Sequence, residues 1–120
     1  MSTVLVVEDS VTEMQILTSY LQQAGLSVVS AQSVEEAHVK LASQNPDLIV
    51  LDVILPGQSG FELCRELKAD PKTSQIPVVM CSTKDTEVDK MWGSLLGANA
   101  YLPKPVDPVV FLSTIRQLMK

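Results

Sequence analysis

The sequence contains a small set of polar side chains that stand directly after short apolar runs and that could act together. Three carboxylates, one hydroxyl and one ammonium form the set, so its formal charge is −3 plus 1, or −2. A divalent cation would neutralise that charge, and such oxygen ligands suit Mg²⁺, or Mn²⁺ in its place, together with a phosphate. Three close carboxylates without a cation would repel one another. The residues are Glu8, Asp9, Asp52, Ser82 and Lys104.

Each residue of the set also has an ordinary structural explanation. The acidic pair could be solvated turn residues, the hydroxyl could begin a helix, and the ammonium could be a loop charge. Asp52 is harder to explain in this way, because it lies between Leu48–Leu51 and Val53–Leu55. An unpaired carboxylate in an apolar stretch is costly. The coincidence of all five at the ends of apolar runs therefore favours a shared site.

The apolar runs are typical of strands in a parallel sheet that helices cover on both faces. Three of them are nearly continuous and rich in β-branched residues, at 4–7, 48–51 and 78–81. Two more polar runs, at 27–31 and 100–102, are expected at the sheet edges.

Helix signals lie between these runs. Two Ser-x-x-Glu segments, at 10–13 and 33–36, fit the capping box. Asp107 and Pro108 predict an N-cap followed by proline in the first turn, and Gly25 is expected to end the first helix. The pattern predicts a strand and a helix repeated five times, which is an open, doubly wound α/β fold. In such sheets ligands bind at the carboxyl ends of the strands, where the five polar residues would meet.

The fourth helix is expected to present one apolar face to the core. Val88, Met91, Trp92, Leu95 and Leu96 recur at helical spacing. This spacing favours a core-facing Trp92, or one at the edge of the core. The alternative is that Trp92 marks a surface for a partner, where exposed aromatic residues are enriched.

Length, charge and cysteine content exclude several classes of protein. The chain has 120 residues with 9 basic and 14 acidic side chains, a net charge of −5, and is expected to form one domain over 1–120. The acidic balance argues against nucleic-acid and anionic-membrane partners. No apolar run approaches the ~18 residues of a membrane span, and no signal peptide is expected. Cys64 and Cys81 lack metal-type spacing and are expected to be buried thiols in a reducing cytoplasm.

Four segments of the sequence, with Gly60, resemble the receiver domain of bacterial two-component response regulators. They are Val6–Ser10, Leu51–Gly57, Ser82-Thr83 and Tyr101–Pro105. The resemblance covers essentially the whole chain, with each motif in the family's order and spacing. It implies a flavodoxin-like or CheY-like sheet of five parallel strands in the order 2-1-3-4-5, with five helices.

The resemblance also implies a role for each site residue. Asp52 would take a phosphoryl group from the phosphohistidine of a kinase. Asp9, Asp52 and the backbone carbonyl of Ile54 would hold Mg²⁺, and Glu8 would act largely through a bound water. Lys104 would pair with the acceptor carboxylate and later with the phosphoryl oxygens.

Three further positions take their roles from the same resemblance. Ser82 would donate its hydroxyl to the phosphoryl group, and Tyr101 would swing inward as Ser82 is drawn to the site. Ile54 and Lys84 lie where side chains tune the lifetime of the phosphoryl group. An aliphatic Ile54 is expected to hinder the attacking water, whereas Lys84 could act in either direction.

The expected output is contact with another protein, because the chain ends at Lys120 and no output domain is expected. The fourth helix, fifth strand and fifth helix are the expected contact face. Segments 10–14 and 82–93 resemble the small regulators of type IV pilus twitching and phototaxis systems. A CheA-like histidine kinase and a downstream motility or pilus protein are the partners this implies. We expect a monomer, with dimerisation on phosphorylation as an alternative.

Other functions remain open at this stage. A phosphate sink, a scaffold that signals without phosphorylation, or a role in general chemotaxis would use the same domain. A flavodoxin-like cofactor protein shares the fold, but Glu8 and Asp9 would repel its phosphate. A phosphatase with an aspartate nucleophile would carry a second acid at the position of Ile54. The protein is therefore expected to catalyse only its own phosphorylation and dephosphorylation.

Overall fold

Five parallel strands form one sheet in the order β2-β1-β3-β4-β5 in the computed structural model of the protein, which describes residues 2–120. The strands are β1 (Thr3–Val7), β2 (Ser27–Ala31), β3 (Leu48–Leu51), β4 (Val78–Ser82) and β5 (Ala100–Pro103). The helices are α1 (Val11–Gln23), α2 (Val34–Ser43), α3 (Gly60–Ala69), α4 (Glu87–Leu95) and α5 (Pro108–Leu118). Both the fold and the edge positions of β2 and β5 are confirmed.

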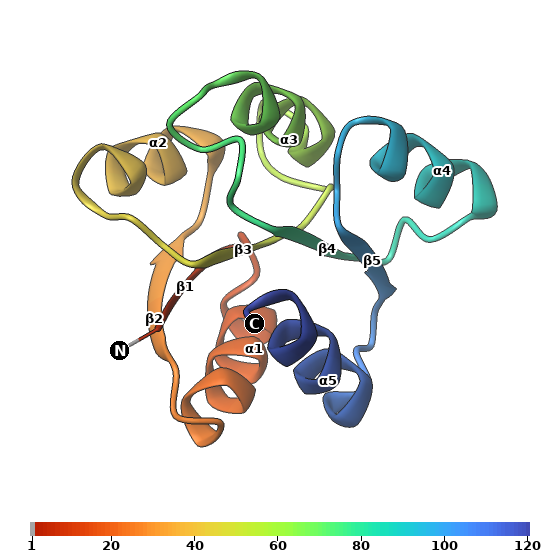
Figure 1. Ribbon diagram of the computed structural model, residues 1–120. Coiled ribbons are helices and arrows are strands. Elements are labelled where there is room, and N and C mark those ends of the chain that lie inside the picture. The colour runs from red at the N-terminus through yellow and green to blue at the C-terminus, as the bar shows by residue number, and fades with distance from the viewer. Residues whose placement is uncertain (1) are drawn as a thin grey trace.

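Helices cover both faces of the sheet, with α1 and α5 on one side and α2, α3 and α4 on the other (Figure 1). Alternate residues of β1 belong to the two cores. Val4 and Val6 pack with the residues of α1 and α5, whereas Leu5 and Val7 pack with those of α2 and α3. Every residue of β3 and β4 is buried. This double burial explains why the central strands read as continuous apolar runs.

The predicted helix starts are present, but the reciprocal half forms in neither of the two predicted capping boxes. At the start of α1, the N–H of Ser10 donates to Glu8 Oε2, at 3.1 Å, and not to Glu13. Ser33 Oγ accepts from the backbone N–H of Glu36, at 3.1 Å, as the box requires. The Glu36 carboxylate instead accepts from the N–H of Gln32, at 3.2 Å. Both halves of a box form at the start of α4, between Thr86 and Asp89, where the sequence analysis expected none.

The core-facing orientation predicted for Trp92 is wrong, since the residue is 50% exposed. The buried residues of α4 are Asp89 and Gly93. A Cβ at Gly93 would lie 2.9 Å from Cδ2 of Tyr101, so the absence of a side chain there lets α4 approach β5 closely. This contact turns most of the apolar stripe toward solvent; its exposed members are Val88, Met91, Trp92 and Leu95.

Strand register places the ends of β1, β3 and β4 side by side. Leu51 lies opposite Val7 on one side and opposite Met80 on the other. The N–H of Asp52 continues the ladder by donating to the carbonyl of Val7, at 3.0 Å. The residues that follow these strands therefore emerge at one edge of the sheet. Within residues 2–120, no helix has both the length and the apolar character of a membrane span.

Candidate functional site

Three carboxylates meet at the carboxyl edge of the sheet. One oxygen from each of Glu8, Asp9 and Asp52 lies within 4.8 Å of the others. Glu8 and Asp52 are buried, whereas Asp9 is exposed. The predicted convergence of these three residues is confirmed. An exposed carboxylate beside two buried ones gives the cluster one side that is open to solvent.

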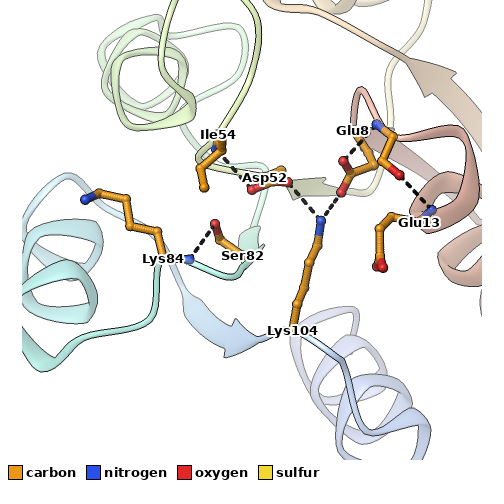
Figure 2. Close-up of polar contacts among 8 residues, drawn as sticks. Glu8, Glu13, Asp52, Ile54, Ser82, Lys84 and Lys104 are labelled. Carbon is orange, nitrogen blue, oxygen red and sulfur yellow. Dashed lines mark hydrogen bonds and ion pairs between the residues drawn. The ribbon is translucent and has the colours of Figure 1, made fainter.

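The buried carboxylates share one ammonium, that of Lys104. Its Nζ donates to Asp52 Oδ2 at 2.8 Å and also to Glu8 Oε1 (Figure 2). The Lys104 side chain is only 7% exposed, so all three charges lie in a region from which water is largely excluded. Buried charges are retained only when they are paired and hydrogen-bonded. Glu8, Asp52 and Lys104 therefore form one electrostatic unit, although they are far apart in the sequence.

The Asp52 carboxylate is fixed in orientation by two donors. Oδ1 accepts from the N–H of Ile54, at 3.0 Å, while Oδ2 accepts from Lys104. The backbone behind Asp52 is also confined, because a Cβ at Gly60 would lie 2.0 Å from the Asp52 carbonyl oxygen. Glycine at this position allows α3 to begin directly against Asp52.

The electrostatics of the unit depend on burial and on mutual hydrogen bonds. Burial raises the pKa of the Glu8 carboxyl, against hydrogen bonds from Lys104 and the N–H of Ser10. For Lys104, burial alone would lower the pKa, but the hydrogen bonds to Asp52 and Glu8 outweigh it and raise the pKa. The ammonium is thus held in its charged form beside the two acids.

Ser82 and Tyr101 are linked through the backbone of Lys84. Ser82 is fully buried at the end of β4, and its Oγ accepts from the Lys84 N–H at 3.2 Å. This leaves the Ser82 O–H free to donate to a ligand. The Tyr101 hydroxyl donates to the Lys84 carbonyl. Burial, with the negative charges of Asp89, Asp52 and Asp85, raises the pKa of Tyr101 to about 12, so the phenol stays protonated as that donor.

The family follows from a match that covers nearly the whole chain. Residues 4–116 match the model of the response regulator receiver domain. The chain belongs to this family. Receiver domains take phosphoryl groups from histidine kinases, contact downstream partners, and bind Mg²⁺ at an acidic pocket. The acidic cluster described above lies where that pocket is expected.

Individual relatives agree with this assignment. Protein PilH of Pseudomonas aeruginosa is 40% identical over 99% of this chain and 98% of its own length. Several other curated relatives are longer, and the chain spans about half of their length or less. Two solved structures are similar along 98% of the chain. A putative response regulator from Chloroflexus aurantiacus has a TM-score of 0.94 and 33% identity over 97% of its chain. Chemotaxis protein CheY4 of Vibrio cholerae has a TM-score of 0.91 and 31% identity over 98% of its chain.

The donor set of this receiver domain fits Mg²⁺. All three candidate ligands are carboxylates, which a small divalent cation prefers. Lys104 and the Ser10 N–H already occupy both oxygens of Glu8. Asp9 faces solvent and has the freer carboxylate for direct binding.

The sequence analysis missed one charged group near the site, Asp89. Its Oδ1 pairs with Lys84 Nζ at 3.2 Å, and its Oδ2 accepts from the N–H and Oγ1 of Thr86 at 3.0 and 2.8 Å. Hydrogen bonds from Thr86 and Lys84 hold the pKa of Asp89 below its usual value. The segment Thr86–Asp89 is itself a Thr-x-x-Asp capping signature, so the helix start was detectable in the sequence. The ion pair between Asp89 and Lys84 could not be detected in the sequence.

Proposed function

We propose that Asp52 accepts a phosphoryl group from the phosphohistidine of a histidine kinase, in a reaction that requires Mg²⁺. The observation that carries this proposal is the position of the Asp52 carboxylate. It is fixed by the Lys104 ammonium and the Ile54 N–H, beside two more carboxylates. Phosphoryl transfer depends mainly on such positioning and on stabilisation of charge.

The transfer step needs only groups that the site and the kinase supply. A carboxylate oxygen of Asp52 attacks phosphorus, so that a P–O bond forms as the P–N bond to the kinase imidazole breaks. The imidazole leaves with the bonding electron pair and takes up a proton. Hydrolysis later returns the Asp52 carboxylate and inorganic phosphate. Asp52 is thus a phosphoacceptor, and the protein catalyses only its own phosphorylation and dephosphorylation.

The remaining site residues receive the new charge. Asp9, Asp52 and the backbone carbonyl of Ile54 would hold Mg²⁺, or Mn²⁺, and Glu8 would act through a bound water. The cation would neutralise negative charge on the phosphoryl oxygens. Lys104 already contacts the acceptor carboxylate and can follow the phosphoryl oxygens. Ser82 has an O–H free to donate to them. The added charge of about −1.5 to −2 is large enough to move these groups.

The first test is intact mass after incubation with acetyl phosphate, with and without Mg²⁺. We expect one phosphoryl adduct that requires Mg²⁺ and is absent from Asp52→Asn. The matched control is Asp70→Asn, because Asp70 ends α3 and is exposed. It should form the adduct at the wild-type rate. An adduct that persists in Asp52→Asn would place the phosphoacceptor elsewhere. No adduct from acetyl phosphate or from a kinase would indicate a scaffold that signals without phosphorylation.

We further propose that Tyr101 couples the site to an output surface formed by α4, β5 and α5. The ring lies against Gly93 of α4, and its hydroxyl bonds to the loop that follows β4. A displacement of Ser82 toward a phosphoryl group would pull on the Lys84 N–H, and so on the carbonyl that Tyr101 contacts. The exposed apolar stripe lies on the same helix as Gly93, which this ring approaches. Phosphorylation-dependent binding of a partner should therefore be lost in Tyr101→Ala while the adduct still forms.

The pathway that fits best is pilus-based motility, phototaxis or chemotaxis, with a CheA-like kinase as donor and a motility or pilus protein as partner. Whole-chain similarity to PilH supports this choice over the other pathways that use receiver domains. We propose a stand-alone, monomeric regulator in the cytoplasm. That compartment suits its two free, buried cysteines. Transfer from a purified CheA-like kinase in seconds, with slow transfer from unrelated kinases, would support it. A phosphate-sink role would show as fast loss of phosphate without partner binding.

A further inference from the structure

The ion pair between Lys84 and Asp89 lies beside the phosphoacceptor site without belonging to the acidic cluster. Asp89 is held in place by its helix, because one carboxylate oxygen accepts both hydrogen bonds from Thr86 in the capping box. The other oxygen binds the Lys84 ammonium at 3.2 Å. The Asp89 carboxylate is thus fixed in position, and the flexible Lys84 side chain extends to reach it.

Lys84 is nevertheless attached next to the site. Its backbone N–H donates to Ser82 Oγ, and its Cα lies one bond, about 1.5 Å, from that nitrogen. Figure 2 shows the side chain extending away from Asp52 and Ser82. The lysine side chain is long and 48% exposed, so other rotamers are open to it. Without its partner, the ammonium could turn toward the acidic cluster that contains Asp52, which is the phosphoacceptor pocket.

An ammonium in that pocket would favour negatively charged donors. The three carboxylates and Lys104 sum to −2, which one divalent cation brings to zero. A small donor such as acetyl phosphate then brings net negative charge into a neutral site. A second ammonium would attract it, whereas a kinase-bound phosphohistidine is delivered by contacts between two proteins and depends less on that attraction.

We propose that Asp89 is a positioning residue that holds the Lys84 ammonium away from the phosphoacceptor pocket and thereby restricts phosphorylation by small anionic donors. This inference rests on the proposed function of Asp52. It makes donor selectivity a consequence of one ion pair at the start of α4. It also links the position of α4 to the charge beside the site, since any movement of Asp89 would release the lysine.

The test compares the initial rate of phosphorylation by acetyl phosphate, at saturating Mg²⁺ and sub-saturating donor, across five proteins. We expect Asp89→Asn to be about two- to fivefold faster than wild type, the scale of one partly exposed ion pair. The gain should be smaller with phosphoramidate, which carries less negative charge. It should also shrink between about 0.05 and 0.5 M salt, because salt screens exposed charges. The five proteins are wild type, Asp89→Asn, Asp89→Glu, Lys84→Met and the double variant Lys84→Met/Asp89→Asn.

The other variants separate this mechanism from a structural effect on α4. The double variant should behave like Lys84→Met, and Asp89→Glu should restore the wild-type rate. A sixth protein, Asp85→Asn, is added as a charge control because it removes an exposed charge from the same loop, and it should show less than half of the Asp89→Asn gain. A gain that persists in the double variant, or no gain in Asp89→Asn, would overturn the inference.

Two further outcomes keep the test decisive. Lys84→Met alone should change the wild-type rate by less than about twofold, because Asp89 already withholds the ammonium. A larger fall would overturn the inference even if Asp89→Asn did not fold, since Lys84 would then already act in the pocket. Failure of wild type to form an adduct with either acetyl phosphate or a kinase as donor would instead overturn the proposed function. The two failures are therefore distinguishable.

Discussion

Lys104 and Lys84 both bind carboxylates near the carboxyl edge of the sheet, but their surroundings differ. Lys104 is 7% exposed and joins two buried acids, Glu8 and Asp52, that come from other strands. Lys84 is 48% exposed and joins Asp89, a near neighbour in the sequence. The first lysine holds together three strand ends, whereas the second holds a loop against the start of one helix.

The difference shows how one kind of interaction can serve two purposes. A buried ion pair is costly to break, because the remaining charge is left without water or a partner. A partly exposed pair is cheap to break, because water replaces the lost partner. The Lys104 unit is suited to fixing a reactive carboxylate, and the Lys84 pair is suited to rearranging when charge changes nearby.

The largest effect should come from breaking the buried unit. Lys104→Met leaves Glu8 and Asp52 facing each other without a counterion. We expect the free energy of unfolding, measured by urea titration without Mg²⁺, to fall by about 3 kcal/mol. Added Mg²⁺ should recover part of the loss by supplying positive charge. Lys90→Met is the control, because Lys90 pairs with an exposed Glu87 at 3.7 Å. An equally small loss of stability in Lys104→Met and Lys90→Met would contradict the distinction between buried and exposed ion pairs.

Removing a carboxylate from the same cluster should not lower the stability of the protein. Asp9→Asn relieves repulsion among the three acids, so the protein without Mg²⁺ should become no less stable. Its affinity for Mg²⁺, measured by calorimetric titration, should fall about tenfold, equivalent to about 1.4 kcal/mol. Glu35→Gln, at an exposed position in the first turn of α2, controls for net charge. Unchanged affinity in Asp9→Asn would remove Asp9 from the ligand set.

Removing the hydrogen bond between the Tyr101 hydroxyl and the Lys84 carbonyl should have a smaller effect than the changes in the acidic cluster. Tyr101→Phe removes the hydroxyl that donates to the Lys84 carbonyl, which should lower the free energy of unfolding by about 1 kcal/mol. The control is Tyr20→Phe, because Tyr20 packs against Phe111 through its ring, with centroids 6.2 Å apart. Equal losses in the two variants would mean that the loss of any tyrosine hydroxyl, and not of this hydrogen bond in particular, accounts for the effect.

The two lysines also differ in how well their surroundings could be predicted from the sequence. Lys104, Asp52 and Glu8 each follow an apolar run, and a parallel sheet must bring such positions to one edge. The α/β fold class and the acidic cluster therefore follow from the local pattern, whereas the strand order 2-1-3-4-5 came from the resemblance to receiver domains. The ion pair of Lys84 with Asp89 has no such signal in the sequence, because it depends on the orientation of α4.

The orientation of α4 was the feature that periodicity predicted wrongly. The spacing of Trp92 and Leu95 defines an apolar face correctly, but it does not say which face of the helix meets the sheet. That choice depends on the fit of the Tyr101 ring against Gly93, a tertiary contact between two elements. In the resulting orientation Asp89 is buried and Trp92 is exposed, which reverses the burial expected for Trp92.

The smallest effect should come from breaking the exposed ion pair. Lys84→Met leaves Asp89 with both of its hydrogen bonds from Thr86, so the capping box should survive. We expect the free energy of unfolding in urea to fall by no more than about 0.5 kcal/mol, and the loss to shrink in high salt. The loss in Lys104→Met should be far less sensitive to salt, because buried charges are screened much less than exposed ones. A loss in Lys84→Met that exceeds about 2 kcal/mol and resists salt would mean that both lysines are structural. The idea that the Lys84 ammonium can be redirected toward the phosphoacceptor site would then fail on energetic grounds, whatever the rates of phosphorylation.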